Sequence, residues 1–358
     1  MTADQSELSE IIKSSARELG FDLVGIAAAT TPLGFHPFLS WIEKGFAADM
    51  SWMERRKDAY QHPAGVLPDC RSVIMVAVNY HHHASQDLSA DSSFSLSPRI
   101  ARYALGHQDY HAVLRGRLRS IVRTIKQFRP DAASRAVVDT APLLERDFAR
   151  QAGIGWFGKN TMLISRNIGS WFFLGAVLTS EQLSYDEAHN SQHCGTCTRC
   201  LDACPTDAFP EPYVLDAGRC ISYLTIERRT EHIPPDLRSG LGSWLFGCDI
   251  CQEVCPWNRF APGECIPEFA VNQSHQSLSL NDLLQMTEST FNERFTGTPL
   301  ERTGRDAIIR NAAIVAGNSG RTDLLTALQQ LLQDDSELIR EAAYWAIQEI
   351  HTNKNRSQ

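Results

Sequence analysis

Cysteine spacing is the feature of this sequence that most constrains its fold. Eight of the ten cysteines lie between residues 194 and 255. The first run has the pattern Cys-x2-Cys-x2-Cys-x3-Cys-Pro, the second has Cys-x2-Cys-x3-Cys-Pro, and a single cysteine stands between them. In chain order they are Cys194, Cys197, Cys200, Cys204, Cys220, Cys248, Cys251 and Cys255. Cysteine runs this dense, each followed by a proline, predict short turns around a shared group rather than long helices or strands.

The spacing predicts two 4Fe-4S clusters. In bacterial two-cluster ferredoxins, the fourth cysteine of the x2-x2-x3-Pro run binds the other cluster of the pair. The second run here lacks the leading cysteine of such a repeat, and Cys220 is well placed to replace it. We therefore expect a bacterial two-cluster ferredoxin-like domain, in which cluster one takes Cys194, Cys197, Cys200 and Cys255, and cluster two takes Cys204, Cys220, Cys248 and Cys251. Eight thiolates for two clusters leave none over, which indicates electron transfer but not its destination.

Other uses of paired cysteines fit this sequence less well. Structural zinc sites often use two CxxC pairs, but the x2-x2-x3-Pro run is far more specific than that pattern. A disulfide framework suits a short secreted chain, whereas this chain has 358 residues and begins with an amphipathic, acidic segment at residues 6–12. No stretch approaches the roughly 18 apolar residues of a membrane span. We therefore expect a cytoplasmic protein that crosses no membrane.

The rest of the sequence divides into two further regions. With 43% hydrophobic and 21% charged residues, the chain can form about two or three domains with a sizeable core. We expect an α/β domain at 1–190, the cluster domain at 191–265 and an all-α region at 266–358. Predicted strands cover 21–27, 72–80, 136–139 and 171–178, and predicted helices cover 6–19, 37–47, 110–128 and 142–152. The net charge of −8 argues against wholesale coating of nucleic acid, although local basic patches can still bind it.

The carboxy-terminal region contains an internal repeat. The pattern IRNAAxxA at residues 309–316 returns thirty residues later as IREAAxxA at 339–346, with an amphipathic segment at 324–332 between them. This period, with small residues where helices would cross, resembles a short HEAT-like helical repeat. Two copies alone would be marginally stable, so we expect the region to pack on the cluster domain. Such repeats usually bind macromolecules, and a purely structural cap is the alternative.

Asp139 is the acidic residue best placed for chemistry. It ends the apolar segment Val137-Val138 and precedes a predicted helix. Ligands of open α/β sheets gather at the carboxyl ends of strands, which favours a pocket at Asp139. An aspartate before Pro142 and two leucines is also a reasonable helix N-cap. Spacing alone leaves both interpretations open.

The segment 153–160 is rich in glycine. Three glycines in six residues permit close backbone approach to a bulky partner, and Lys159 could meet a phosphate or carboxamide. The segment precedes a strand instead of opening a helix, so it is not the dinucleotide-binding fingerprint. Nor does the sequence contain a P-loop motif. These observations leave flavin and nicotinamide without specific support, so a large planar cofactor of another kind has to be considered.

Several longer motifs resemble those of the epoxyqueuosine reductases. Those motifs are YALG at 103–106, DYH at 109–111, VDT at 138–140, GWFGKN at 155–160, CISYLT at 220–225 and GCDICQ at 247–252. The resemblance covers nearly the whole chain, and Gln108 is one local departure, an extra residue before Asp109. It implies a cobalamin-dependent oxidoreductase with two 4Fe-4S clusters and an α/β cobalamin-binding domain related to reductive dehalogenases. Such an enzyme removes the epoxide oxygen of epoxyqueuosine at the wobble position of tRNA, the last step towards queuosine.

The resemblance also implies roles for individual residues. Asp139 would be the proton donor, and because a donor must be protonated when it acts, we expect burial beside the corrin to raise its pKa. Contacts to cobalamin would come from Arg56, Asp139, Leu163, Leu174, Ser222, Asp249 and Ile250. Ser222, Asp249 and Ile250 adjoin cysteines of cluster two, so we expect cluster two to lie nearer the cobalt.

The partners follow from the same resemblance. We expect a monomer that binds tRNA carrying epoxyqueuosine and receives electrons from an external low-potential donor. Candidate tRNA contacts are Arg228, Arg229, Arg305 and Arg310, for which surface solubility is the competing role. Two alternative functions are another cobalamin-dependent reductase, such as a dehalogenase acting on a small molecule, and a ferredoxin-like electron carrier. The helical tail disfavours the first, and the long α/β region before the clusters disfavours the second.

Overall fold

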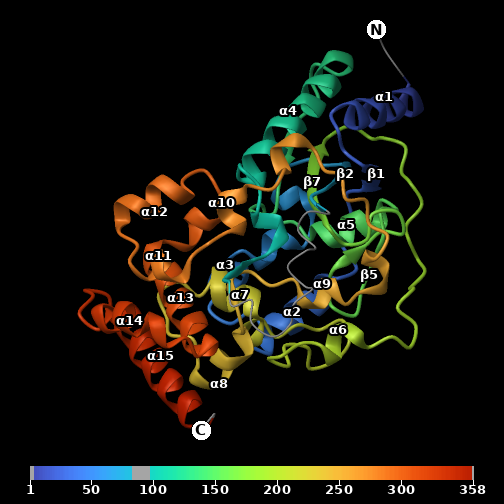
Figure 1. Cartoon of the computed structure of the whole chain (residues 1–358). Coiled ribbons are helices and arrows are strands. Elements are labelled where there is room, and N and C mark those ends of the chain that lie inside the picture. Colours follow the sequence, from blue (N-terminus) through green and yellow to red (C-terminus); the bar gives the residue numbers. More distant parts are fainter. Residues whose placement is uncertain (1–3, 83–96, 357–358) are drawn as a thin grey trace.

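A four-stranded antiparallel sheet forms the centre of the amino-terminal region. The computed structural model of the chain describes residues 4–82 and 97–356. The strands follow the order β1-β2-β7-β4, and each neighbouring pair is antiparallel (Figure 1). Their bounds are Leu23–Ala28 for β1, Ser72–Asn79 for β2, Ser134–Val137 for β4 and Phe172–Thr179 for β7. The rule about carboxyl ends of parallel strands therefore does not describe this sheet, and a pocket at Asp139 needs other evidence.

Helices cover both faces of the sheet because β2 is apolar on both sides. Every residue of β2 is buried, which explains its continuous apolar sequence. The even-numbered residues 74–78 pack with α1 and α4, whereas the odd-numbered residues 73–77 pack with Phe148 and Ala149 of α5. These helices span Gln5–Glu18 (α1), Tyr110–Phe128 (α4) and Glu145–Gln151 (α5), and two shorter ones span Phe35–Glu43 (α2) and Ser51–Arg55 (α3).

The segment between β4 and α5 differs from the prediction in a way that matters for Asp139. Helix α5 begins at Glu145 rather than at 142. Its N-cap is Leu144, and no side chain caps it. Asp139 lies in a turn that leaves β4 after Val137. Its role as a helix cap is therefore excluded, and its carboxylate is available for other contacts.

The cysteine-rich segment folds as short helices and turns, as predicted. Its helices are α6 (Arg199–Asp202), α7 (Ile221–Ile226), α8 (Pro235–Arg238) and α9 (Ile250–Glu253). Strand β8 (Trp244–Phe246) pairs in parallel with β3 (Arg99–Ile100) and so joins this segment to the amino-terminal region. A short antiparallel hairpin, whose strands β5 (Trp156–Phe157) and β6 (Leu163–Ile164) have two residues each, lies beside the cysteine-rich segment.

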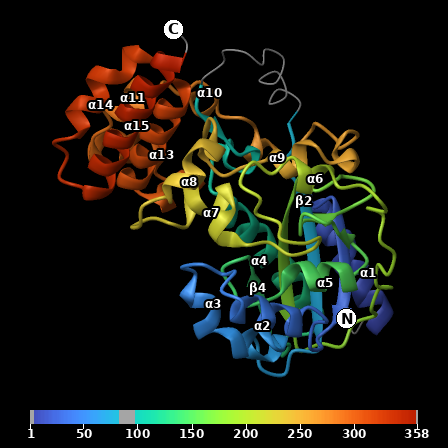
Figure 2. The ribbon, with the colours of Figure 1, turned by 90° about the horizontal axis from the view of Figure 1, so that it is seen from below.

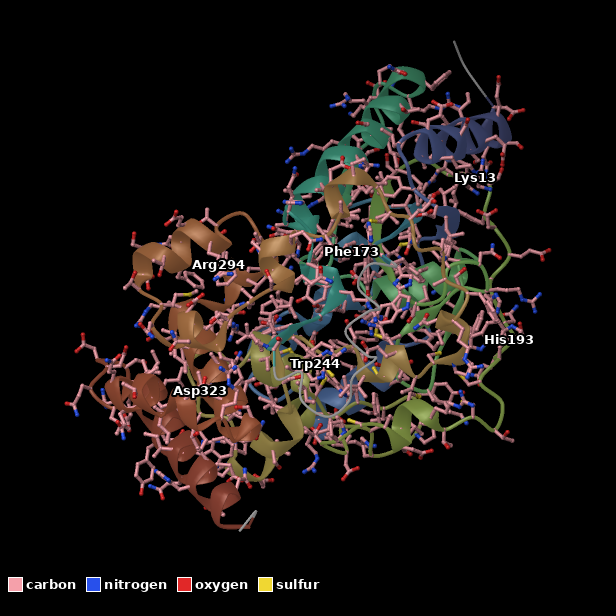
Figure 3. The ribbon with its side chains drawn as sticks, in the orientation of Figure 1. Lys13, Phe173, His193, Trp244, Arg294 and Asp323 are labelled. Atoms are coloured by element: carbon pink, nitrogen blue, oxygen red, sulfur yellow. The ribbon has the colours of Figure 1, made fainter. Side chains whose placement is uncertain are left out.

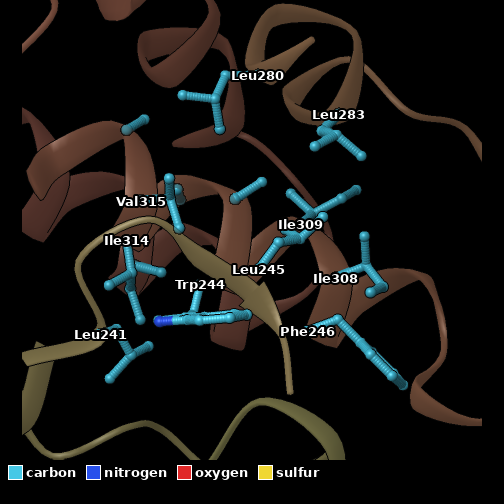
Figure 4. Packing of buried hydrophobic residues seen from close by; sticks show 14 of the residues in the cluster. Leu241, Trp244, Leu245, Phe246, Leu280, Leu283, Ile308, Ile309, Ile314 and Val315 are labelled. Atoms are coloured by element: carbon cyan, nitrogen blue, oxygen red, sulfur yellow. The ribbon is translucent and has the colours of Figure 1, made fainter. Parts of the chain in front are cut away.

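The carboxy-terminal region is helical and packs on the cluster segment (Figure 2). Its helices are α10 (Gln273–Gln276), α11 (Leu280–Leu284), α12 (Glu288–Phe295), α13 (Arg305–Ser319), α14 (Leu325–Leu331) and α15 (Glu337–Arg356). One apolar cluster contains β8, with Trp244 and Phe246, together with Ile308 and Val315 of α13 (Figure 4). The repeated sequence lies on α13 and α15, which pack together so closely that a Cβ on Gly317 would come within 2.9 Å of the Cα of Ala346. Among the described residues, no helix is long and apolar enough to cross a membrane.

Candidate active site and cluster ligands

The structure brings the cysteines together in the two predicted sets. Burial, and next the charges of Cys255, Cys194 and Cys197, raise the pKa of the Cys200 thiol to about 11. Burial likewise raises the pKa of the Cys251 thiol, and the charge of the neighbouring Cys220 thiolate raises it further.

The second set is completed by two further thiols. Cys204 is near both Cys220 and Cys251, and Cys248 is near Cys220 and Cys251. The charge of Cys200 in the first set also raises the pKa of Cys251 in the second, so the two sets are neighbours. Within residues 4–82 and 97–356, no three His, Cys, Asp or Glu side chains are arranged to hold a single metal ion.

The turn between β5 and β6 is bonded to both cysteine sets. The Nζ atom of Lys159 donates to the carbonyl oxygens of Gly195 at 2.8 Å and Cys197 at 3.0 Å. The side-chain amide of Asn160 donates to the carbonyl of Cys251 at 3.2 Å. Lys159 therefore bonds to the backbone of the first cysteine run, a contact that the sequence pattern does not reveal.

The glycines of the same segment serve the hairpin rather than a cofactor. A Cβ on Gly155 would collide with the carbonyl oxygen of Ile164 on the partner strand, and one on Gly158 would lie 2.6 Å from the Ile164 side chain. Gly153 has a φ of +76° just after α5, a conformation that favours glycine. Close approach occurs here between segments of the chain itself, so the glycine pattern does not indicate a bulky ligand.

Asp139 is held by two side chains from the start of α4. Its Oδ1 lies 2.7 Å from Nε2 of His111, and its Oδ2 accepts a hydrogen bond from the hydroxyl of Tyr110. On the other side of the imidazole, Nδ1 of His111 lies 2.6 Å from Oδ1 of Asp109. The Tyr110 ring stacks on Phe173 of β7, with ring centroids 4.2 Å apart, near the middle of the molecule (Figure 3). A rigid aromatic contact therefore fixes the side chains that position Asp139.

The electrostatics of this group contradict one prediction. Burial would raise the pKa of Asp139, but the hydrogen bond and charge of His111, with Tyr110 and Arg302, outweigh it and lower that pKa. Burial would lower the pKa of His111, but hydrogen bonds to Asp109 and Asp139 raise it to about 9. The expected rise in the pKa of Asp139 is wrong because its partners are a cation and a hydroxyl donor. At neutral pH the pair is an imidazolium and a carboxylate.

The remaining predicted cofactor contacts differ in accessibility. Arg56 is exposed and donates to the carbonyl of Thr140 at 3.2 Å, so it lies beside the Asp139 turn. Asp249 is buried, accepts from the backbone N–H of Arg102 at 2.8 Å, and has a pKa raised by burial to about 6. Burial raises the pKa of the Tyr103 hydroxyl, and the charges of Asp139 and Asp249 raise it further. Tyr103 therefore lies near both acids.

The apolar members of the predicted set line a shared cluster. Leu163 is buried and Leu174 is half-buried, and both belong to the cluster of α5 and the sheet. Ser222 and Ile250 are half-buried beside the cysteines of cluster two. Leu163 can offer a ligand only its main chain, whereas the others keep some side-chain surface.

The structure corrects one of the proposed tRNA contacts. The Arg310 side chain is 1% exposed and donates to the backbone carbonyls of Leu224, Arg228 and Glu231. It is a structural residue and cannot meet an external phosphate. Periodicity could not reveal this, because α13 is buried nearly all around.

Two of the other three basic residues are half-buried and the third is exposed. Arg305 pairs with Asp306 and Asp334, and Arg228 pairs with Asp49. The exposed Arg229 lies 3.5 Å from Glu227. Ion pairs that reach solvent exchange partners at little cost, so these partly or fully exposed residues stay open as tRNA contacts.

Sequence reasoning gave no role to three residues that the site depends on. The sequence indicates Asp109, Tyr110 and His111 only as the motif DYH. A further neighbour of the site is Arg302, whose Nη1 lies 3.2 Å from Nε2 of His111. The adjacency of an acid, a phenol and an imidazole was the available signal, but nothing in the sequence pairs it with Asp139.

Known proteins resemble this chain over nearly its whole length, and two family models match parts of it. The family model of a 4Fe-4S double cluster binding domain matches residues 193–258, and that of epoxyqueuosine reductase QueG matches residues 61–140. The chain is 39% identical to an epoxyqueuosine reductase of Xanthomonas campestris pv. campestris over 345 residues, covering 96% of both chains. It is 41% identical to that of Pseudomonas aeruginosa over 353 residues, covering 96% of this chain and 95% of the relative.

Solved structures give the same result. A crystal structure of epoxyqueuosine reductase with an epoxyqueuosine-modified tRNA-Tyr stem loop has a TM-score of 0.86 at 29% identity, and covers 96% of this chain and 90% of that one. The Bacillus subtilis enzyme with its catalytic aspartate loop swung out of the active site has a TM-score of 0.85, with the same identity and coverage.

Fold, thiol sets and family model together define an iron–sulfur oxidoreductase with two 4Fe-4S clusters. Relatives this similar over nearly their whole length decide the family. The chain belongs to the epoxyqueuosine reductases, and the resemblance predicted from the sequence is confirmed. The overall fold is confirmed with it, whereas the domain bounds and the HEAT-like character of the tail stay predictions.

Proposed function

We propose that this protein reduces epoxyqueuosine to queuosine at the wobble position of tRNA. The observation that carries the proposal is the combination of two neighbouring sets of four thiols with an aspartate fixed by hydrogen bonds, in a chain of this family. The clusters that the thiol sets would hold pass single electrons from an external donor, and the aspartate provides a proton. Opening an epoxide to an alkene with loss of water consumes two electrons and two protons, so both supplies are required.

The residues present suit a corrin as the second cofactor. Exposed Arg56 and Asp139 and half-buried Ser222 offer polar groups, Leu174 offers apolar surface, and Leu163 offers its main chain. This mixture matches a large planar ring that carries amide side chains. Cobalamin supplies low-valent cobalt, which can reduce the substrate once electrons arrive. The protein orients the substrate, excludes water and delivers the proton.

Asp139 is the proton donor in this proposal. It lies in a turn rather than in a strand or helix, its side chain is 37% exposed, and His111 and Tyr110 fix both carboxylate oxygens. A donor needs this combination of access and orientation. The Bacillus subtilis relative has its catalytic aspartate on a loop, which is the setting that Asp139 occupies here.

The substrate base must leave its stack to reach such a site, so we expect the anticodon loop to be splayed on binding. Arg228, Arg229 and Arg305 remain candidates for phosphate contacts, and the HEAT-like tail is a candidate for part of the same surface. We also keep an external low-potential electron donor, a monomeric state and a cytoplasmic location as predictions.

One experiment tests the function directly. The protein is purified anaerobically with its clusters, supplied with cobalamin and a strong one-electron reductant, and incubated with epoxyqueuosine-containing tRNA. Mass spectrometry of the nucleosides should show conversion to queuosine. An active-cluster preparation that converts none would disprove the function.

The donor role is tested with Asp139→Asn. This variant should still bind cobalamin and tRNA but lose most turnover, by about 100-fold or more, because an amide cannot release the proton. The matched control is Asp131→Asn, at an exposed aspartate before β4, which should behave like the wild type. Near-normal turnover of Asp139→Asn would remove Asp139 from its role.

A further inference from the structure

Asp109, His111 and Asp139 form a continuous chain of hydrogen bonds. The imidazole is bonded at both nitrogens, 2.6 Å from Asp109 and 2.7 Å from Asp139, and its side chain is only 6% exposed. Asp109 is the N-cap of α4, and its carboxylate also accepts from the backbone N–H of His111 at 3.0 Å. The capping contact therefore fixes the acid that orients the ring.

We propose that His111 is a positioning residue that holds Asp139 in place and stores, at Nε2, the proton that Asp139 delivers. This inference rests on the proposed function, in which Asp139 donates a proton during epoxide reduction. Asp109 binds the Nδ1–H in both charge states of the ring, so Nε2 is the nitrogen that gains and loses a proton.

The proton balance of the step is simple. The Nε2–H bond of the imidazolium breaks as an O–H bond forms on Oδ1 of Asp139, giving neutral histidine and neutral carboxylic acid. The acid then releases a proton to the departing substrate oxygen and returns to the carboxylate. The neutral ring regains a proton from solvent, and a second transfer along the same route supplies the second proton that release of water requires. The two electrons come from the external low-potential donor through the clusters.

Charged and titratable neighbours decide how tightly this proton is held. Tyr110 donates to the far oxygen of Asp139, and Arg302 lies 3.2 Å from Nε2 of His111. Tyr103 and Glu145 interact with Asp139, and burial with the charge of Asp139 raises the pKa of Glu145 to about 8. The guanidinium of Arg115 donates to the hydroxyl of Thr140, next to Asp139, at 3.1 Å. The groups around the pair are thus Asp109, Tyr110, Arg302, Tyr103, Glu145, Arg56 and Arg115, with Arg146 acting on Glu145.

The first test measures the proton itself, without cobalamin or tRNA. Cluster-loaded protein carrying isotope-labelled histidine is titrated by NMR, and the His111 signal is identified by its absence in His111→Gln. His111 should titrate with a pKa of about 9, and Asp139→Asn and Asp109→Asn should each lower that value. Titration near the ordinary value of about 6.5 would overturn the inference and leave the proposed function intact.

The second test is the pH dependence of single-turnover rates. The wild type should lose activity above about pH 9, when the pair loses its proton. Glutamine at 111 keeps a donor to Asp139 but stores no proton, so the alkaline limit should move more than about two pH units lower. At pH 8 a shift of two units is a loss of about 10-fold, which acidification should partly reverse.

Two controls separate positioning from damage. His107→Gln changes an exposed histidine before α4 and should leave the alkaline limit where it is. Should His111→Gln fold poorly, Asp109→Asn keeps the ring and should shift the same limit by a smaller amount. An equal loss of rate at every pH in these variants would show a purely structural role and refute the inference. If His111 of the wild type titrates with a pKa near 9 but Asp139→Asn keeps full activity, the donor role in the proposed function is rejected instead.

Discussion

At the scale of single residues, the proton on His111 links the site to the stability of the fold. The folded chain raises the pKa of His111 to about 9, through hydrogen bonds that outweigh burial. A group that binds its proton more tightly when folded stabilises the fold below its unfolded pKa, about 6.5, and loses that contribution as pH rises towards 9. The apparent Tm of the wild type should therefore fall between pH 6.5 and 9 by more than that of His111→Gln. Parallel melting curves of the two proteins across this range would contradict the prediction.

The same residues show what the sequence can and cannot predict about a site. Asp139 was singled out because it follows an apolar strand and lies in a recognisable motif. Its pKa was predicted with the wrong sign, because the charge state of a carboxylate depends on partners that local sequence does not reveal. His111 lies 28 positions away in the chain, and only the packing of α4 on the sheet brings it to Asp139. Arg310 misled for the same reason, since a basic residue on a helix is usually exposed.

At the scale of elements, the β5–β6 turn links the amino-terminal region to both cysteine sets. The ammonium group of Lys159 donates hydrogen bonds to the carbonyl oxygens of Gly195 and Cys197, between the first cysteines of the cluster-one set. A positive charge there favours the reduced, more negative cluster. Lys159→Met should therefore shift the reduction potential of one cluster to a more negative value and leave the other nearly unchanged, as measured by a redox titration followed by EPR.

The control for this prediction removes the same charge elsewhere. Lys126→Met, at an exposed position near the end of α4, should leave both potentials unchanged. If Lys159→Met and Lys126→Met gave the same potentials, the bonds from Lys159 would have no electrostatic role. Lys159→Arg should restore most of the wild-type value.

Whether an element can be predicted from its hydrophobic pattern depends on its length. The 19-residue helix α4 was predicted over 110–128 because its apolar residues recur at a helical period. Strands β5 and β6 have two residues each, too few for any period to appear. Glycines required for the close pairing of such a hairpin are easily mistaken for glycines that admit a ligand.

At the scale of the whole molecule, buried polar residues of α13 join the tail to the cluster segment. Arg310 donates to carbonyls at and after α7, and Asn311 donates to the carbonyls of Thr225 and Leu245 at 2.9 Å. Removing one such partner leaves several buried carbonyls without a donor. Arg310→Met should therefore destabilise the protein by about 3 kcal/mol or more, seen as a lower Tm and faster proteolysis of the tail.

An exposed arginine of the tail provides the comparison. Arg321 pairs with Asp323, and its side chain is 41% exposed. Because exposed ion pairs contribute about 0–1 kcal/mol, Arg321→Met should change the Tm little. Equal effects of the two substitutions would argue against the buried network as the link between tail and clusters.

The apolar core shared by β8 and α13 has a consequence for how the enzyme matures. Cys220 and Cys248 pack against that core, so two of the cysteines that we assign to cluster two are placed by contacts that need no iron. Iron would then be delivered to thiols that already face one another, with α13 acting as their template. A chain shortened before α13 should accordingly emerge from the cell poor in iron, and its failure to act on tRNA would be secondary to that loss.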